Sequence, residues 1–320
     1  MTQVSDQSRG TSRWAAGTQR ALRITVLCGG PSAEREVSLV SGRAVADALR
    51  RRGHQVHVTD IFPDDLSALD RPVDVVFPAL HGTFGEDGAV QAIMEARGIR
   101  YCGSDAAASA LAMDKPAAKR AVGAAGVPTP RFDVVDDGTR AEIAAAWQAP
   151  VVLKPVAEGS SVGVTIVRRT AEIAAALDAM LERYGQALIE AYVPGPELTV
   201  GVLGDEALPV VQIVTAREFY DYQAKYEDDG TEYRFDIDLP DELLREVQRL
   251  SLEAHRALGC RDFSRVDWMV DAASGRPYFL ETNTIPGFTG HSLLPKAAAR
   301  AGRGFDGLVE RIVELTLERS

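Results

Sequence analysis

The chain has 320 residues, of which 46% are hydrophobic and 25% charged, and its net charge at pH 7 is −11. This length favours two or three domains of an ordinary soluble globular protein. The acidic balance argues against nucleic acid as a partner. We expect no membrane span, because no apolar run approaches the roughly 20 residues that cross a bilayer. Three widely spaced cysteines are typical of reduced, buried thiols in a cytoplasmic protein: Cys28, Cys102 and Cys260.

The first third of the chain alternates strand-like and helix-like segments. Residues 1–20 are polar and lack the apolar region of a secretory signal, so we expect a flexible tail. Arg23–Cys28 predicts a buried strand that ends in a Gly-Gly turn. The helix that follows should end at Gly53 and bury one face, formed by Val40, Ala44, Val45, Ala48 and Leu49. Further alternation predicts an N-terminal parallel α/β domain over residues 21–104.

The pattern changes after residue 104. Ala106–Gly126 is Ala-rich and helical, and Pro116 within it is tolerated only near a helix start. Residues 127–130 form a Pro-containing linker, and short strands and helices of an α+β pattern follow, including a strand over Val162–Val167. We expect a central domain over residues 105–190 and a C-terminal domain over 191–320.

Two strand-like segments near the C-terminus carry carboxylates in a regular spacing. Because strand side chains alternate between faces, Arg265 and Asp267 share one face, as do Glu281 and Asn283. A symmetric hairpin centred near Ser274 places Asp267 opposite Glu281. Two carboxylates this close repel each other unless a cation lies between them, and oxygen ligands favour Mg²⁺. The alternative is a solvated hairpin with unrelated charges.

Three further segments could bind a ligand. Lys154 ends an apolar strand, where it is costly without an anionic partner, and the Gly/Ser loop after it could close over phosphate oxygens. Glu34 lies where a strand turns into a helix and could bind an ammonium group, although an acidic first helical turn is favourable in any case. His81 stands in a Gly-rich turn after a strand, where it could also have no role.

These segments belong to a longer series of short motifs: Gly29–Ser38, His81–Gly88, Met113–Lys115, Lys154–Gly163, Leu188–Glu190, Gly195–Glu197, Phe219–Tyr226, Arg265–Asp267, Glu281–Gly287 and His291–Leu293. In this order and at these separations, the series resembles the D-alanine–D-alanine ligase family of the ATP-grasp superfamily. The match runs from about residue 22 to residue 318. The resemblance implies a three-domain ATP-grasp fold, with ATP between the second and third domains.

The resemblance also implies an ATP site with Mg²⁺ or Mn²⁺, two ions in each site. The implied phosphate contacts of ATP are Lys115, Lys154 and Lys225. Glu190 and Val193 would contact the adenine, and Glu197 the ribose. The implied metal ligands are the hairpin residues Asp267, Glu281 and Asn283, in agreement with the argument from strand spacing.

The implied reaction joins two D-alanines through an acyl phosphate and releases ADP and phosphate. Arg265 and the Gly287 backbone N–H would stabilise the oxyanion, while Glu34, Ser160 and Tyr226 would form a hydrogen-bonded link. The implied substrate-binding residues are Glu34, His81, Ser292 and Leu293. One departure from the family pattern is a proline missing from Tyr233–Ile237.

The resemblance implies a cytoplasmic homodimer that supplies peptidoglycan synthesis. Two alternatives stay open at this point. One is an ATP-grasp ligase with a different second substrate, such as D-lactate, D-serine or another amino acid. The other is a non-catalytic nucleotide-binding protein, which would be expected to have lost a metal ligand or a phosphate-binding lysine.

Overall fold

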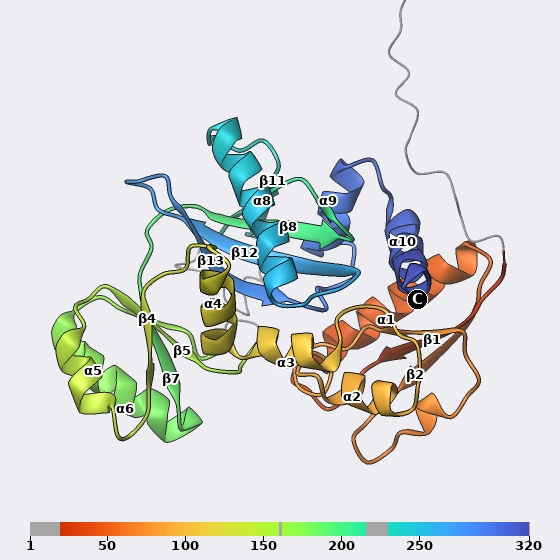
Figure 1. Ribbon diagram of the computed structural model, residues 1–320, viewed down its shortest axis with the longest axis horizontal. Coiled ribbons are helices and arrows are strands. Elements are labelled where there is room, and N and C mark those ends of the chain that lie inside the picture. Colours follow the sequence, from red (N-terminus) through yellow and green to blue (C-terminus); the bar gives the residue numbers. More distant parts are fainter. Residues whose placement is uncertain (1–19, 160–161, 216–229, 320) are drawn as a thin grey trace, which may run out of the picture.

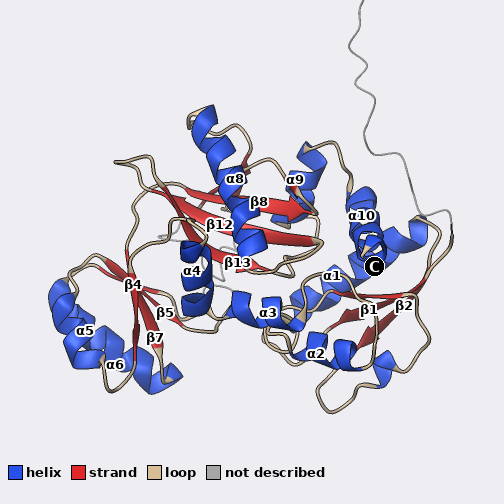
Figure 2. Ribbon diagram, in the orientation of Figure 1, coloured by secondary structure: helices blue, strands red, loops and turns tan. Residues whose placement is uncertain are grey.

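The structure, a computed structural model, describes residues 20–159, 162–215 and 230–319. The expected N-terminal tail therefore lies almost entirely outside the described residues. The described residues form three separate β-sheets, each packed against helices (Figures 1 and 2). The N-terminal and central sheets lie at opposite ends of the molecule, and the C-terminal sheet joins them (Figure 1).

The N-terminal sheet has the order β2-β1-β3 and is parallel throughout, which confirms the predicted parallel α/β arrangement. Its strands are β1 (Arg23–Cys28), β2 (Gln55–Asp60) and β3 (Val75–Pro78). The strands are joined and followed by α1 (Arg35–Arg51), a short 3-10 turn at Ser67–Leu69, and α2 (Ala89–Ala96). Strand β1 is apolar because helices and a neighbouring layer cover both of its faces.

The buried face of α1 differs from the predicted one in its first half. Val45, Ala48 and Leu49 are fully buried, but Val40 is 48% exposed. The prediction for Val40 was wrong because Val40 lies on the side of α1 that faces a cavity, and it lines that cavity. The helix ends at Arg51, and Gly53 follows with a φ of 94°, which confirms the predicted stop.

The central part begins with two helices, where the sequence predicts a helical segment with Pro116 near a helix start. Helix α3 (Ala106–Met113) ends before Asp114, which caps α4 (Lys115–Ala124) by accepting from Ala117 N–H. Pro116 lies in the first turn of α4, the place where a helix tolerates proline.

An antiparallel sheet of order β4-β7-β5-β6 follows. Its strands are β4 (Phe132–Val135), β5 (Val151–Pro155), β6 (Thr165–Val167) and β7 (Ala187–Ala191). Strand β6 is shorter than the predicted Val162–Val167. Helices α5 (Arg140–Ala146) and α6 (Ile173–Tyr184, after a 3-10 turn at Thr170–Glu172) share a core with this sheet (Figure 1).

The C-terminal sheet is also antiparallel, with the order β11-β10-β8-β12-β13 and β9 beside β8. Its strands are β8 (Glu197–Leu203), β9 (Glu206–Ala207), β10 (Val211–Val214), β11 (Glu232–Arg234), β12 (Phe263–Val270) and β13 (Pro277–Asn283). Helix α8 (Asp241–Ala257) shares a core with it, and Trp268 donates to Ser251 of that helix at 2.9 Å.

The last two helices return to the N-terminal sheet. Helices α9 (Leu293–Arg300) and α10 (Phe305–Glu318) join α1 and β1 in one hydrophobic core. His54, after α1, donates from Nε2 to Glu310 of α10 at 2.9 Å, and both side chains are buried. The N-terminal sheet is therefore completed by the opposite end of the chain.

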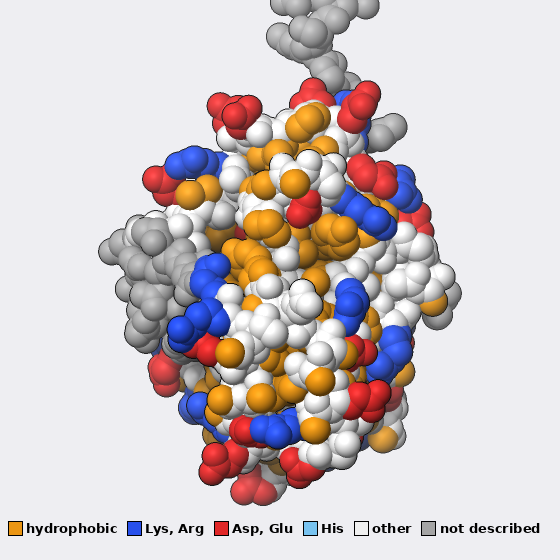
Figure 3. Space-filling model, turned by 90° about the vertical axis from the view of Figure 1, so that its left-hand side faces the viewer, with side chains coloured by type: hydrophobic (Ala, Val, Ile, Leu, Met, Phe, Trp, Pro, Cys, Tyr) orange, Lys and Arg blue, Asp and Glu red, His pale blue; other side chains and the backbone are white. Residues whose placement is uncertain are grey.

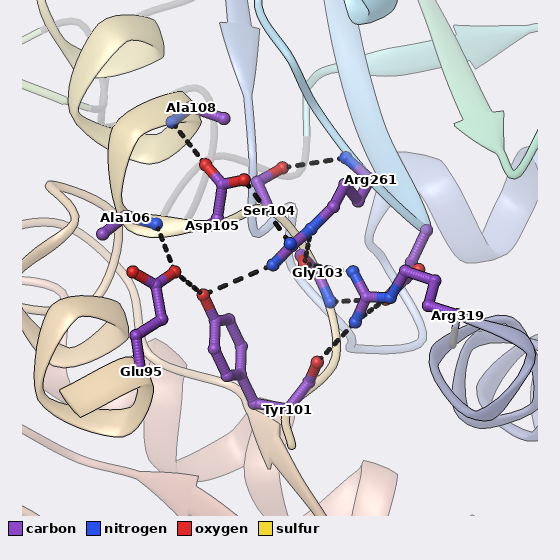
Figure 4. A network of polar contacts seen from close by, with 10 residues as sticks. Glu95, Tyr101, Gly103, Ser104, Asp105, Ala106, Ala108, Arg261 and Arg319 are labelled. Carbon is purple, nitrogen blue, oxygen red and sulfur yellow. Dashed lines mark hydrogen bonds and ion pairs between the residues drawn. The ribbon is translucent and has the colours of Figure 1, made fainter. Parts of the chain in front are cut away.

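A polar junction ties the segment after β3 to the C-terminal part (Figure 4). Arg319 donates to the carbonyl oxygens of Tyr101 and Gly103, at 2.7 and 3.1 Å. Asp262 accepts from Gly103 N–H at 2.8 Å and pairs with Arg319 at 3.1 Å. Arg261 reaches the Tyr101 hydroxyl and pairs with Asp105. These contacts fix the direction in which the chain leaves the N-terminal sheet.

The end of the molecule that carries α5 and α6 has a mixed surface (Figure 3). Basic and acidic side chains alternate around it, and hydrophobic side chains gather toward its middle. Among the described residues, no helix is both long and apolar enough to cross a membrane.

Candidate active site

Two cavities meet inside the molecule. The larger, of about 640 Å³, lies between the N-terminal and C-terminal parts, and the smaller, of about 380 Å³, lies between the central and C-terminal sheets. Three residues line both cavities: Lys115, Glu158 and Glu281. A group bound in one cavity can therefore reach a group bound in the other past these side chains.

A buried cluster of alternating charges borders the smaller cavity. Glu190 of β7 is 1% exposed and forms ion pairs with Lys154 of β5 and with Lys119 of α4, the latter at 2.8 Å. Val152 lies opposite Glu190 in the sheet, so Lys154, two residues on, is its diagonal neighbour on the same face. The anionic partner that Lys154 was predicted to need is thus Glu190.

The pKa values of this cluster follow from burial and pairing. Burial alone would raise the pKa of Glu190, but the charges of Lys119 and Lys154 hold it below its ordinary value. Burial likewise opposes the charge of Lys154, yet Glu190 raises its pKa. For Lys119, burial and the nearby Lys154 charge outweigh Glu190 and lower its pKa to about 8.

Lys115 stands where the two cavities meet. It begins α4, its Nζ donates to the carbonyl oxygen of Glu158, and it lies 3.8 Å from the carboxylate of Glu281. The backbone N–H of Lys115 also bonds to Val156, in the loop after β5. The start of α4 therefore holds the segment that directly follows β5.

The hairpin of β12 and β13 places its carboxylates as predicted. Asp267 lies opposite Glu281, and Arg265 lies opposite Asn283. An irregularity follows directly, because Trp268 then pairs with Phe279 and leaves one extra residue on β13. The predicted pairing of Asp267 and Glu281 is confirmed. The predicted symmetry about Ser274 holds for residues 265–267 with 281–283, and the register shifts by one residue between the bulge and the turn.

Asp267 is held by three different side chains. It accepts from Thr199 Oγ1 at 2.6 Å, from the Arg265 guanidinium at 2.9 and 2.8 Å, and from Asn283 Nδ2 at 2.9 Å. Thr199 lies opposite Asp267 on β8, so the three strands β8, β12 and β13 present one row of oxygen-bearing side chains. Within the described part of the chain, no three His, Cys, Asp or Glu side chains form a metal-binding cluster. The predicted set instead combines two carboxylates with one amide.

The larger cavity is lined by the substrate-binding residues that the sequence predicts. Glu34 precedes α1, His81 follows β3, and Ser292 and Leu293 stand at the start of α9. Gly287 lies close to Ser292, because a Cβ added at Gly287 would come within 2.7 Å of Ser292 Oγ. A side chain at position 287 would therefore displace Ser292.

His81 and Glu86 connect the N-terminal part to the loop after β13. His81 Nδ1 donates to the carbonyl oxygen of Ile285 at 3.1 Å, and its Nε2 is 3.1 Å from Ser41 Oγ. Glu86 accepts from the backbone N–H of Ile285 at 3.2 Å and of Gly82 at 2.8 Å. Both ring nitrogens of His81 are thus engaged by protein groups, and the loop that contains Gly287 is held from the N-terminal side.

Burial favours the neutral forms of both residues. Burial lowers the pKa of His81, although Glu34 and Ile285 oppose this shift. Burial, together with the charge of Glu34, raises the pKa of Glu86 to about 8. The larger cavity thus carries a carboxyl group whose ionised form burial disfavours.

Comparison with known proteins agrees with this geometry. Residues 62–104 and 122–314 match the family models described as the N-terminus and the C-terminus of D-ala D-ala ligase. A D-alanine–D-alanine ligase of Geotalea uraniireducens (strain Rf4) is 48% identical over 293 residues, which cover 91% of this chain and 94% of that protein.

The chain belongs to the D-alanine–D-alanine ligase family.

Solved structures of ligases have the same fold. A D-Ala:D-Ser ligase from Enterococcus faecalis superposes with a TM-score of 0.82 at 30% identity, over 93% of this chain and 100% of that one. A D-alanine–D-alanine ligase from Bacillus anthracis, complexed with ATP, gives a TM-score of 0.79 at 33% identity, over 93% and 98%. The predicted ATP-grasp fold is therefore confirmed for this member of the D-alanine–D-alanine ligase family.

Most of the predicted site residues line the two cavities of this family member. The smaller cavity is lined by Lys115, Lys154, Glu190, Val193, Glu197, Asp267 and Glu281. The larger one is lined by Glu34, His81, Arg265, Asn283, Gly287, Ser292 and Leu293, together with Lys115 and Glu281. Ser160, Lys225 and Tyr226 lie outside the described residues.

Two ionisable residues at or beside the cavities were missed by the sequence analysis, Lys119 and Glu86. A compositional signal could have found the first. Only five of the 35 basic residues are lysines, and the other four are Lys115, Lys154, Lys225 and Lys296. Lys119 also lies four residues after Lys115, on the same side of a helix. For Glu86 the sequence carries no such signal, because burial in the folded chain decides its role.

Proposed function

We propose that this protein joins two D-alanines to D-alanyl-D-alanine and converts one ATP to ADP and phosphate. The observation that carries the proposal is the meeting of two cavities at Lys115, Glu158 and Glu281. The smaller cavity has lysines that could bind a nucleoside triphosphate, and the larger cavity has carboxylate and amide groups that could bind small amino acids. The names of the relatives support the same reaction.

For the smaller cavity we propose the nucleotide. Lys115 and Lys154 would contact its phosphates, Glu190 and Val193 the adenine edge, and Glu197 the ribose. This assignment is supported by the lining of the cavity, which combines Lys115 and Lys154 with apolar side chains. Lys225 would reach the γ-phosphate.

We propose that Asp267, Glu281 and Asn283 hold two Mg²⁺ or Mn²⁺ ions. The donor set is of the right kind, because all three offer oxygen atoms and stand on one face of facing strands. Divalent cations bound there would neutralise charge on the transferred phosphoryl group.

The reaction would run in two steps. A carboxylate oxygen of the first D-alanine attacks the γ-phosphorus, which gives an acyl phosphate and ADP. The neutral amine of the second D-alanine then attacks the acyl carbon, and phosphate leaves as the oxyanion collapses. Arg265 and the Gly287 N–H would stabilise that oxyanion, and enclosure of the cavity would protect the acyl phosphate from water.

The larger cavity would hold both amino acids. Glu34 would bind the ammonium group of the first, while Ser292 and Leu293 at the start of α9 would bind the carboxylate of the second. His81 would contribute to the same site. A link of Ser160, Tyr226 and Glu34 would close it.

We also propose that the enzyme acts in the cytoplasm, where ATP is available, as a homodimer that supplies dipeptide for peptidoglycan synthesis. The three cysteines are buried and unpaired, as expected in a reducing compartment. Sedimentation of the purified protein would test the dimer, and a single species at the monomer mass would reject it.

The experiment that tests the reaction is ADP release with a panel of second substrates in the presence of Mg²⁺. We expect release that requires D-alanine, with D-alanyl-D-alanine as the product. D-Serine and D-lactate belong in the panel, because a D-Ala:D-Ser ligase shares the fold. Faster turnover with D-alanine plus D-serine than with D-alanine alone would change the assigned substrate. No release with any D-amino acid would reject the ligase.

A further inference from the structure

Lys119 is a fully buried lysine behind the smaller cavity. It is 1% exposed, lies one helical turn after Lys115 on α4, and does not line either cavity. A buried ammonium group is costly unless it is paired and hydrogen-bonded. Its position therefore requires an explanation beyond packing.

Three structural elements converge on the Lys119 ammonium. Its Nζ pairs with Glu190 of β7 at 2.8 Å, donates to Thr129 Oγ1 in the linker at 2.9 Å, and lies 3.5 Å from the Phe279 carbonyl oxygen of β13. A compact ammonium with three donors suits this site better than a planar guanidinium. Lys119 thus joins the central sheet to the strand that carries Glu281.

The charges of the cluster do not cancel within it. Glu190 is shared between Lys119 and Lys154, so one carboxylate serves two cations. If Lys119 were neutral, Glu190 would compensate Lys154 alone, and the interaction would be strong because Glu190 is buried and the Lys154 side chain is only 12% exposed. With Lys119 charged, the cluster keeps one positive charge beside the cavity, and among the described residues Glu281 and Glu197 also act electrostatically on Lys154.

We propose that Lys119 is a positioning residue for ATP: it neutralises Glu190 from behind and so leaves the charge of Lys154 available to the nucleotide phosphates. The inference rests on the proposed nucleotide site and names a residue that would act there without touching the ligand. It predicts an effect on phosphate recognition that is separate from any effect on the adenosine moiety.

The test measures binding without D-alanine, with Mg·ATP and adenosine as the two probes. For Lys119→Met we expect the affinity for ATP to fall at least about tenfold, while that for adenosine changes by less than about threefold. Arg120→Met is the matched control, because it removes an exposed positive charge from the next position of α4. Its affinities for both probes should equal those of the wild type.

Equal weakening of both probes by Lys119→Met would show that Lys119 supports only the fold or the adenine contact of Glu190, and unchanged ATP affinity would also overturn the proposal. If Lys119→Met does not fold, Thr129→Val is the second variant. It removes one hydrogen-bond acceptor of the Lys119 ammonium and keeps the shape of the side chain at position 129. Thr129→Val should lower the affinity for ATP about twofold to fivefold and leave the affinity for adenosine unchanged. Unchanged ATP affinity would again reject the inference. A wild-type protein that binds no ATP would instead reject the proposed function.

Discussion

The two cavities that meet at Glu281 treat buried charge in opposite ways. Beside the smaller cavity, Lys119 and Glu190 are buried and Lys154 is largely covered, and Glu190 and Lys154 hold their charges because each has an opposite partner. In the larger cavity, burial lowers the pKa of His81 and raises that of Glu86 to about 8. Burial thus disfavours charge beside both cavities, and charge persists where counter-ions are supplied.

This difference suits the two ligands that we propose. A triphosphate is strongly anionic and gains from a cation that is already dehydrated and held in place. The amino acids bring their own charges, and the acyl phosphate formed from one of them must be kept from water. A cavity whose own buried groups are mostly neutral does not add repulsion to those charges.

The largest expected effect is at the residue that belongs to both cavities. Glu281→Gln should lower kcat by more than about tenfold, a loss of at least about 1.4 kcal/mol in transition-state stabilisation, because the amide has one charge less for a bound cation. The fold should persist, since the side chain is 26% exposed and the substitution keeps its shape. Steady-state ADP release measures the effect.

Glu242→Gln is the control for this change, because Glu242 is exposed in the first turn of α8, away from both cavities. It should leave kcat as in the wild type. A Glu281→Gln protein that keeps more than about a tenth of the wild-type kcat would argue against the metal-binding role.

A smaller effect is expected in the pH dependence of folding stability, through Glu86 in the larger cavity. The folded protein holds a proton on Glu86 up to a pKa of about 8, against an ordinary value of 4.5, so between these pH values it binds a proton that the unfolded chain has lost. This contribution to stability is therefore full at low pH and is lost as the pH rises, by at most about 1.4 kcal/mol per pH unit. Glu86→Gln removes the titration.

Thermal unfolding of the wild type and of Glu86→Gln from pH 5.5 to 8.5 measures this effect. The variant should gain stability relative to the wild type as the pH rises, whatever constant offset the amide causes. Burial causes most of the rise in the pKa of Glu86, the charge of Glu34 adds to it, and the charge of Arg265 opposes it. A difference between the two proteins that does not change with pH would show that Glu86 is ionised throughout.

The smallest effect concerns the rim of the larger cavity. Val40→Ala should change the free energy of unfolding by less than about 0.5 kcal/mol, because Val40 is already half exposed. Val45→Ala, on the buried side of the same helix, should cost roughly 2 kcal/mol or more. Denaturant unfolding compares them, and equal costs would mean that Val40 is covered in solution.

Local sequence patterns were sufficient to predict several parts of this protein's structure. The two-residue period of strands and the short hairpin predicted that Asp267 faces Glu281, and the structure has this pair. The cost of a buried lysine predicted an anionic partner for Lys154. The alternation of strands and helices predicted the parallel N-terminal sheet. Each of these depends on residues close together in the chain.

The tertiary structure decided which distant residues meet. Glu190 became the partner of Lys154 because β5 and β7 are neighbours, and Lys119 joined them from a helix 71 residues before Glu190. Helix α10 completed the core of a sheet formed at the other end of the chain, and a cavity left Val40 exposed on an otherwise regular helix face. Sequence periodicity states which side of an element is apolar or charged, whereas burial, and with it the charge state of Glu86, depends on what packs against that side.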